Sequence, residues 1–135
     1  RALKKGTIDA VTSDHQPHDL DAKDGAFMST EAGLSTLDGF LPALCEVGRR
    51  HEIPFATLVR AASFLPARIL GTDGGRMRVG GPADLCLFDP DAEYRFHESD
   101  IVSRGANSPL LGRRMTGRVA GTMVAGDVVF EGPGL

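Results

Sequence analysis

The segment GTIDAVTSDHQPHD, residues 6–19, holds the feature that decides the fold. Its first half, Ile8 to Thr12, is short and apolar and predicts a buried β-strand. Gly6 is placed to end a preceding helical turn, because glycine adopts the left-handed conformation at no steric cost. The second half is polar and follows the strand directly. Polar residues just after a buried strand are typical of an active-site loop in an α/β protein.

This polar loop brings one carboxylate, Asp14, and two imidazoles, His15 and His18, into a few residues. A carboxylate can ligate a metal ion, and it can also accept a proton from the water that the metal activates. The spacing is equally compatible with a plain turn. In that turn Asp14 would cap a backbone amide, with His15 half-buried and His18 exposed. On the residues alone both interpretations stay open.

Helical patterns follow a loop over residues 20–35. Apolar residues recur at spacings of three and four from Ser35 to Val47, which predicts a helix that ends at Gly48 and the charged run Arg49 to Glu52. A second helix is expected from Pro54 to Phe64. A short third helix is expected from Ala67 to Leu70, because Pro66 suits the first turn of a helix.

The composition changes after these helices. Glycine and proline are frequent over residues 73–83, and strand patterns follow. These patterns lie at residues 84–89, 93–96 and 117–130. A turn at Asp89-Pro90-Asp91 separates the first two, and Gly126-Asp127 splits the last into a hairpin. We therefore predict an α/β part over residues 1–72 and a small β domain over residues 73–135.

The bulk properties exclude some classes of partner. The chain has 135 residues and a formal net charge of −3, which argues against nucleic acid and anionic membrane surfaces. No apolar run approaches the roughly 20 residues that span a bilayer. Cys45 and Cys86 lie in apolar patterns, so we expect buried, reduced thiols and a cytoplasmic protein. The chain begins without Met, and we expect it to be a piece of a longer protein.

Three motifs carry a family resemblance. Gly6 to Asp9, followed by the loop Ser13 to His18 (SDHQPH), is similar to the eighth barrel strand and loop of dihydroorotases. Pro66 to Gly71 (PARILG) and Pro82 to Leu85 (PADL) resemble motifs found throughout the amidohydrolase superfamily. Asp84, in the last motif, is expected to make structural hydrogen bonds at the start of a strand. The resemblance covers essentially the whole chain.

This resemblance implies the fold. The chain would be the C-terminal part of a metal-dependent (β/α)₈ TIM barrel, joined to a small, composite β-sandwich domain. Residues 1–72 would supply the last barrel strand, the active-site loop and helices, and residues 73–135 the β domain. A barrel takes about 250 residues, so we expect no complete metal centre in this segment alone.

The same resemblance assigns roles to single residues. Asp14 aligns with the metal-binding aspartate, which also serves as general base and acid. His18 aligns with a histidine that holds the substrate carboxylate. Ala32 and Gly33 align with a loop whose backbone contacts the dihydropyrimidine ring. His15 has no ligand role, and we expect it to steady Asp14.

The implied activity is that of a dihydroorotase, the reversible closure of N-carbamoyl-aspartate to dihydroorotate in pyrimidine biosynthesis. The implied cofactor is Zn²⁺ in a two-metal centre, with other divalent metals as the alternative. We expect a small-molecule substrate, no nucleic acid or membrane partner, and a homo-oligomer when the protein is intact.

Two departures from the family pattern keep an alternative open. Gln16 stands where active dihydroorotases carry a small residue, and Thr30-Glu31-Ala32-Gly33 replaces their usual A-P-F-G. Both features resemble a non-catalytic branch of dihydroorotase-like proteins, which serve as structural partners of aspartate carbamoyltransferase. A hydantoinase- or allantoinase-like hydrolase is a further alternative, although those enzymes tend to lack the histidine at position 18.

Overall fold

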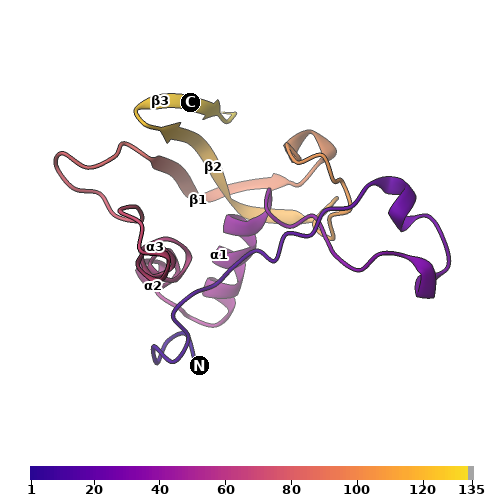
Figure 1. The fold of residues 1–135 in the computed structure, drawn as a ribbon, viewed down its shortest axis with the longest axis horizontal. Coiled ribbons are helices and arrows are strands. Elements are labelled where there is room, and N and C mark those ends of the chain that lie inside the picture. The colour runs from indigo at the N-terminus through magenta and orange to yellow at the C-terminus, as the bar shows by residue number, and fades with distance from the viewer. Residues whose placement is uncertain (134–135) are drawn as a thin grey trace.

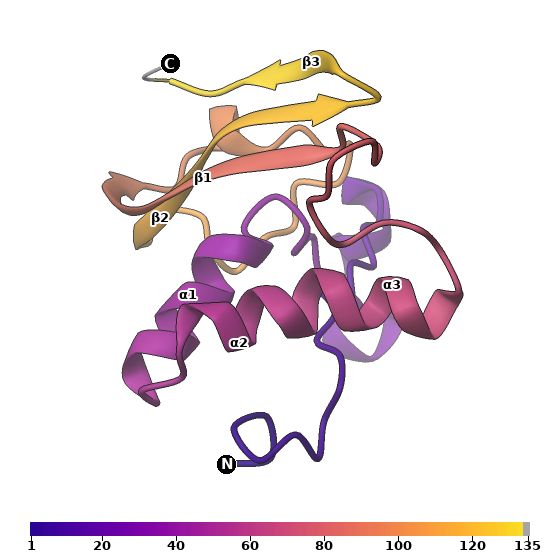
Figure 2. The same ribbon diagram turned by 90° about the vertical axis from the view of Figure 1, so that its left-hand side faces the viewer.

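The computed structural model describes residues 1–133 and arranges them as one sheet over a helical layer (Figures 1 and 2). The principal elements are α1 (Phe40–Arg50), α2 (Phe55–Val59), α3 (Leu65–Leu70), β1 (Leu85–Arg95), β2 (Arg114–Val124) and β3 (Asp127–Glu131). The strands are antiparallel and lie in the order β1-β2-β3. The sheet contacts the helical layer mainly where α1 packs against β2.

The core lies where α1 begins. Phe96, Leu110 and Met115 form a buried cluster, and Ala43 of α1 packs against it. Gly39, the residue before α1, lies so close to this cluster that an added Cβ would be 2.1 Å from Leu110 Cδ1. A side chain at position 39 would require the Leu110 side chain to move, and the start of α1 thus packs closely on the segment between β1 and β2.

The second and third predicted helices are one continuous helix. A π-helical turn, Arg60–Phe64, joins α2 to α3. Pro66 in α3 has no N–H, and in a regular α-helix its ring would collide with the carbonyl four residues earlier. The wider π turn just before it is a known way to accommodate such a break in the hydrogen-bond ladder. Gly71, with φ of 69°, ends α3 in the left-handed conformation.

The β part differs from prediction in one place. β1 is a single strand, and the predicted turn at Asp89-Pro90-Asp91 is an irregularity within it. The Asp89 carboxylate accepts the amides of Asp91 and Ala92, which draws the backbone out of register without ending the strand.

The predicted hairpin between β2 and β3 is confirmed, with its turn one residue earlier than the predicted Gly126-Asp127. Its two turn residues, Ala125 and Gly126, both have positive φ, at 52° and 93°. The Asp84 carboxylate accepts the Ala125 amide at 2.7 Å. Asp84 therefore has the structural role that its place at the start of a strand predicts.

The predicted strand over Ile8 to Thr12 is wrong for this chain. The segment is extended but joins no sheet, and the Ile8 side chain is 47% exposed. A strand exists only with a ladder partner, and in a parallel barrel both partners are other barrel strands. Here Val11 instead donates its amide to Ala61 O, at 3.0 Å. Gly6 does end a helical turn as predicted, with φ of 70°.

The structure also limits other predictions. Residues 1–133 contain one sheet, so the predicted sandwich of two sheets is not complete within them. Both cysteines are free, but only Cys45 is buried; Cys86 is exposed, contrary to prediction. None of the helices described is long and apolar enough to cross a membrane. The division of the chain at residue 72 stays a prediction.

Asp38 ties the turn before α1 to the segment after β1. Its carboxylate accepts the Val102 amide at 2.9 Å, and the amide and hydroxyl of Ser103 at 3.2 and 2.6 Å. Burial alone would raise the pKa of Asp38, but the hydrogen bonds from Ser103 and Val102 outweigh it and hold the pKa below its ordinary value of 3.8. The ionised carboxylate therefore stabilises the fold.

We predict that Asp38→Asn lowers the free energy of unfolding of the intact protein by about 1–3 kcal/mol near pH 7. Because the folded-state pKa is depressed, this stabilisation is complete above the unfolded pKa and is lost as the pH falls through the folded one. Urea unfolding followed by circular dichroism measures the difference between variant and wild type across this range. Asp21→Asn, at an exposed carboxylate, is the matched control. A difference that is independent of pH would contradict the role given to the ionised group.

Candidate active site

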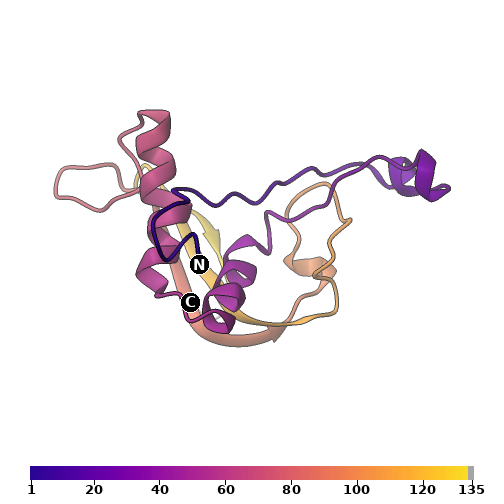
Figure 3. The ribbon, with the colours of Figure 1, turned by 90° about the horizontal axis from the view of Figure 1, so that it is seen from below.

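The loop of residues 13–18 is held against residues 34–37 by hydrogen bonds. The backbone amide of Gln16 donates to Leu34 O at 3.0 Å, and the Thr36 hydroxyl donates to Ser13 O at 2.7 Å. In Figures 1 and 3 these two stretches, indigo and purple, lead side by side out to the excursion formed by residues 19–32. The loop is therefore fixed at both ends by the segment that enters α1.

His15 anchors this segment. Its Nδ1 accepts the amides of Thr36 and Leu37, both at 3.1 Å. Since both partners are donors, Nδ1 is the unprotonated nitrogen and Nε2 carries the proton. This ring satisfies amides just before α1, which begins at Phe40 and not at Ser35 as predicted. The hydrogen bonds of His15 thus steady the approach to α1 and not Asp14.

Asp14 is exposed, and Gln16 is the group that contacts it. The Gln16 side-chain amide donates to Asp14 Oδ1 at 2.9 Å. Asp14 also has a φ of 48°, which is uncommon outside glycine although aspartate tolerates it better than most residues. Strained backbone of this kind clusters at functional sites. Oδ1 accepts the hydrogen bond from Gln16, and Oδ2 accepts none from the described residues, so Oδ2 is the more accessible oxygen for a metal ion or a proton.

The predicted substrate residues lie together. His18 Nε2 is 2.9 Å from Ala32 O, and this nitrogen must be the donor because a carbonyl can only accept. Gly33 has a φ of 135°, and a Cβ there would lie 2.6 Å from Gln16 O and 3.2 Å from His18 Nε2. Glycine is therefore required for residues 16–18 and 33 to approach this closely. The substrate roles of His18, Ala32 and Gly33 stay predictions.

Two further side chains contact the same strip of backbone. Lys23 Nζ donates to the carbonyls of Glu31 and Gly33, the latter at 2.9 Å. Asn107 Nδ2 donates to Gly33 O at 3.2 Å. Lys23 and Asn107 lie 10 and 74 residues from Gly33, and no local sequence signal predicts the contact.

The described residues contain no cluster of side chains that could bind a metal ion by itself. Within residues 1–133, no three side chains of histidine, cysteine, aspartate or glutamate come together as a ligand cluster. The exposed Asp14 carboxylate has the chemistry of a single ligand, whereas a zinc site in an enzyme takes at least three protein ligands. Any further ligands would lie outside the described chain.

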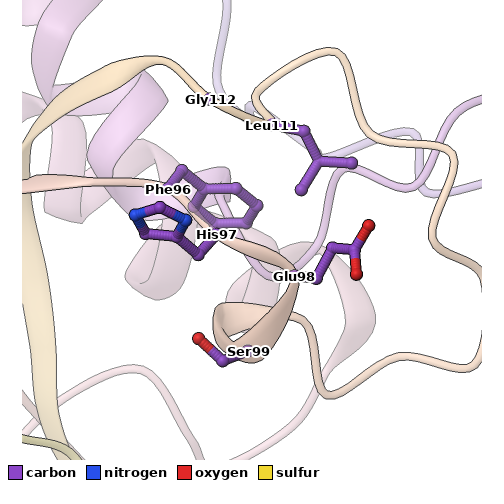
Figure 4. Close-up of a pocket in the computed structure, with 6 residues that line it drawn as sticks. All are labelled: Phe96, His97, Glu98, Ser99, Leu111 and Gly112. Atoms are coloured by element: carbon purple, nitrogen blue, oxygen red, sulfur yellow. The ribbon is translucent and has the colours of Figure 1, made fainter.

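A surface hollow formed by described residues is separate from this loop (Figure 4). It has a volume of about 440 Å³ and is lined by Phe96, His97, Glu98, Ser99, Leu111 and Gly112. None of the predicted site residues borders it. The hollow lies at the end of β1, and we do not assign it to the candidate site.

Comparison with known proteins places the chain among amidohydrolases. A family model described as "Amidohydrolase family" matches residues 1–130. A dihydroorotase from Geotalea daltonii is 42% identical over 129 residues, which are 96% of this chain and 30% of that protein. A dihydroorotase-like protein from Pseudomonas aeruginosa is 40% identical over 131 residues, 97% of this chain and 31% of that protein.

A solved structure shares the fold. The L-hydantoinase (dihydropyrimidinase) of Arthrobacter aurescens superposes with a TM-score of 0.86 at 29% identity, over 96% of this chain and 30% of that one. The chain thus spans about 30% of the length of the relatives that it matches. A C-terminal piece of an amidohydrolase barrel protein accounts for these matches.

We predict that Gly33→Ala weakens the contact between the two stretches of the site. The new Cβ would collide with the Gln16 backbone, so the hydrogen bond from the Gln16 amide to Leu34 O must lengthen. The Gln16 amide should then exchange its hydrogen about tenfold faster or more in the intact protein, as NMR or mass spectrometry can measure. Gly80→Ala is the control, because Gly80 also has positive φ but open space around it. Equal effects of the two substitutions would show that the close approach does not matter.

Proposed function

This chain belongs to the amidohydrolase family, and we propose that the intact protein is a cyclic amidohydrolase of the dihydroorotase type. It would interconvert N-carbamoyl-aspartate and dihydroorotate as a step of pyrimidine biosynthesis. The observation that carries the proposal is the exposed Asp14 carboxylate in the same loop as His18, whose imidazole is hydrogen-bonded to Ala32 O.

Asp14 would handle the proton of the reaction. Opening a cyclic amide requires water to lose a proton as it adds to the carbonyl carbon, and the ring nitrogen to gain one as the C–N bond breaks. One carboxylate can perform both transfers in turn, as general base and then as general acid. Asp14 Oδ2, which accepts no hydrogen bond from the described residues, is the more accessible oxygen for accepting and returning this proton.

His18 would orient the substrate. Its Nε2 donates to Ala32 O, so Nδ1 is the ring atom that remains for a ligand. A protonated Nδ1 is a suitable donor to the carboxylate of dihydroorotate, and a charge-assisted hydrogen bond of this kind fixes orientation. The contact with Ala32 holds the imidazole beside the backbone on which the ring would lie.

A divalent metal fits this arrangement as a partner of Asp14. When bound, it makes water nucleophilic at neutral pH and polarises the amide carbonyl. The described chain would contribute Asp14 as one ligand, and the rest of the protein the others. Zn²⁺ is our first candidate because carboxylate and histidine ligands suit it, with other divalent ions as alternatives.

We predict that Asp14→Ala in the intact protein lowers the turnover of dihydroorotate by about 10³-fold or more, since it removes both the proton carrier and a ligand. Asp19→Ala removes an exposed carboxylate just beyond the loop and should retain activity. Ring opening is followed in a spectrophotometric assay, with a substituted hydantoin and allantoin as competing substrates. Full activity of Asp14→Ala would refute the catalytic role, and preference for a competing substrate would favour a hydantoinase or allantoinase.

A second candidate function is a non-catalytic, dihydroorotase-like partner of aspartate carbamoyltransferase. The specific observation is the hydrogen bond from Gln16 to Asp14, because it occupies one oxygen of the proposed base at a position where active dihydroorotases carry a small residue. The relative from Pseudomonas aeruginosa, described as dihydroorotase-like, points in the same direction.

The two candidates differ in metal content and in partner. For the enzyme we expect stoichiometric bound metal by elemental analysis, together with turnover that persists in Gln16→Ala, since the substitution frees Asp14 Oδ1. For the scaffold, the intact protein would carry no metal and would co-elute with aspartate carbamoyltransferase in gel filtration. Inactive, metal-free protein that forms this complex would overturn the enzymatic proposal.

A further inference from the structure

The backbone of residues 31–33 is fixed by side chains to an unusual degree. Three successive carbonyls, of Glu31, Ala32 and Gly33, each accept a hydrogen bond from a side chain. The His18 imidazole donates to Ala32 O, and the Lys23 ammonium donates to the carbonyls of Glu31 and Gly33. Carbonyls in a surface loop usually bond to water. These three side-chain hydrogen bonds therefore indicate that a defined backbone conformation of residues 31–33 is needed for function.

Lys23 is held in place for this contact. It is the last residue of a 3₁₀ turn, Leu20–Lys23, and is half-buried while Leu20 and Asp21 of the same turn are exposed. Next to Lys23, the Glu31 backbone amide donates to Ala22 O at 3.0 Å, which joins the outgoing and returning parts of the excursion. The excursion over residues 19–32 extends far from the sheet in Figure 3, and Lys23 ties its returning end to its outgoing end.

Asn107 holds the same strip from the opposite part of the chain. It lies between β1 and β2, and its side chain donates to Gly33 O while its carbonyl accepts the Ser35 amide at 2.8 Å. The Ser35 hydroxyl donates to Gly105 O. The segment that leads into β2 is thereby connected directly to the candidate substrate backbone.

The carbonyls of Ala32 and Gly33 accept hydrogen bonds from side chains, whereas their backbone amides are available to a ligand. Within residues 1–133, neither amide donates to another protein group. Free amides recognise acceptors, such as the ring carbonyl and carboxylate oxygens of a cyclic amide anion. The Lys23 ammonium beside them adds a favourable positive charge.

We propose that Lys23, assisted by Asn107, is a positioning residue that fixes the Ala32–Gly33 backbone for an anionic cyclic amide; this role rests on the proposed function. Lys23 does not touch the reacting atoms. Its removal should therefore weaken substrate binding more than it slows the chemical step.

The test compares four variants of the intact, metal-loaded protein in the ring opening of dihydroorotate. Lys23→Met should raise KM about tenfold or more and leave kcat within about threefold, since hydrogen bonds to a charged group are lost. Lys23→Arg keeps the charge and the donors and should restore KM to within about threefold of wild type. Asn107→Ala removes one neutral hydrogen bond and should raise KM by about threefold. Lys5→Met, at an exposed lysine, should match wild type.

Hydrogen exchange at residues 31–35 and the melting temperature complete the test. Faster exchange confined to this strip in Lys23→Met, with an unchanged melting temperature, supports positioning. Wild-type KM in Lys23→Met would overturn the role, as would equal loss of activity in Lys23→Met and Lys23→Arg with lowered melting temperatures. Absence of turnover in the wild-type protein would instead overturn the proposed function itself, and the positioning role with it.

Discussion

The hydrogen bond from the Gln16 amide to Leu34 O is the contact on which the candidate site depends. It holds together two stretches that the excursion would otherwise separate, and it is possible only because Gly33 has no side chain. The contacts around it repeat the same connection, from His15 to the approach of α1 and from His18 to Ala32. The exposed carboxylate of Asp14 is therefore presented by a fixed loop and not by a free one.

This loop is also connected to the sheet. Asp38 and Ser35, which lie just after Gly33, form hydrogen bonds with the segment between β1 and β2. Gly39 packs its backbone against Leu110 of the same segment. The segment between β1 and β2 thus fixes the backbone that follows the candidate site. This contact is a physical reason for the loop and the β part to occur in one chain. In a barrel enzyme of this family, the small domain would help to shape the active-site face through these contacts.

Local rules predicted the local features. Gly6 follows from the positive φ that its turn requires, and Asp84 from hydrogen bonding at a strand start. The hairpin was predicted at Gly126-Asp127, one residue beyond the turn that the structure shows. Features that depend on distant residues were not predictable. The segment over residues 8–12 has no strand partners among the described residues. Pro66 is accommodated by a π-helical turn and does not end the helix. Lys23 and Asn107 both bind Gly33 O, because the fold brings them to it. At the site, the contact of His18 with Ala32 joins two of the residues that the motif singles out, whereas the bond from Gln16 to Asp14 was not predicted, and the functional roles stay predictions.

The central claim is that Asp14 faces a bound cation beside a cyclic amide. The most direct measurement is a crystal structure of the intact protein with zinc and dihydroorotate. Our account predicts that an Asp14 carboxylate oxygen ligates the metal, and that His18 Nδ1 and the amides of Ala32 and Gly33 contact the ligand. An Asp14 side chain turned away from any metal, with the ligand bound elsewhere or not at all, would contradict it.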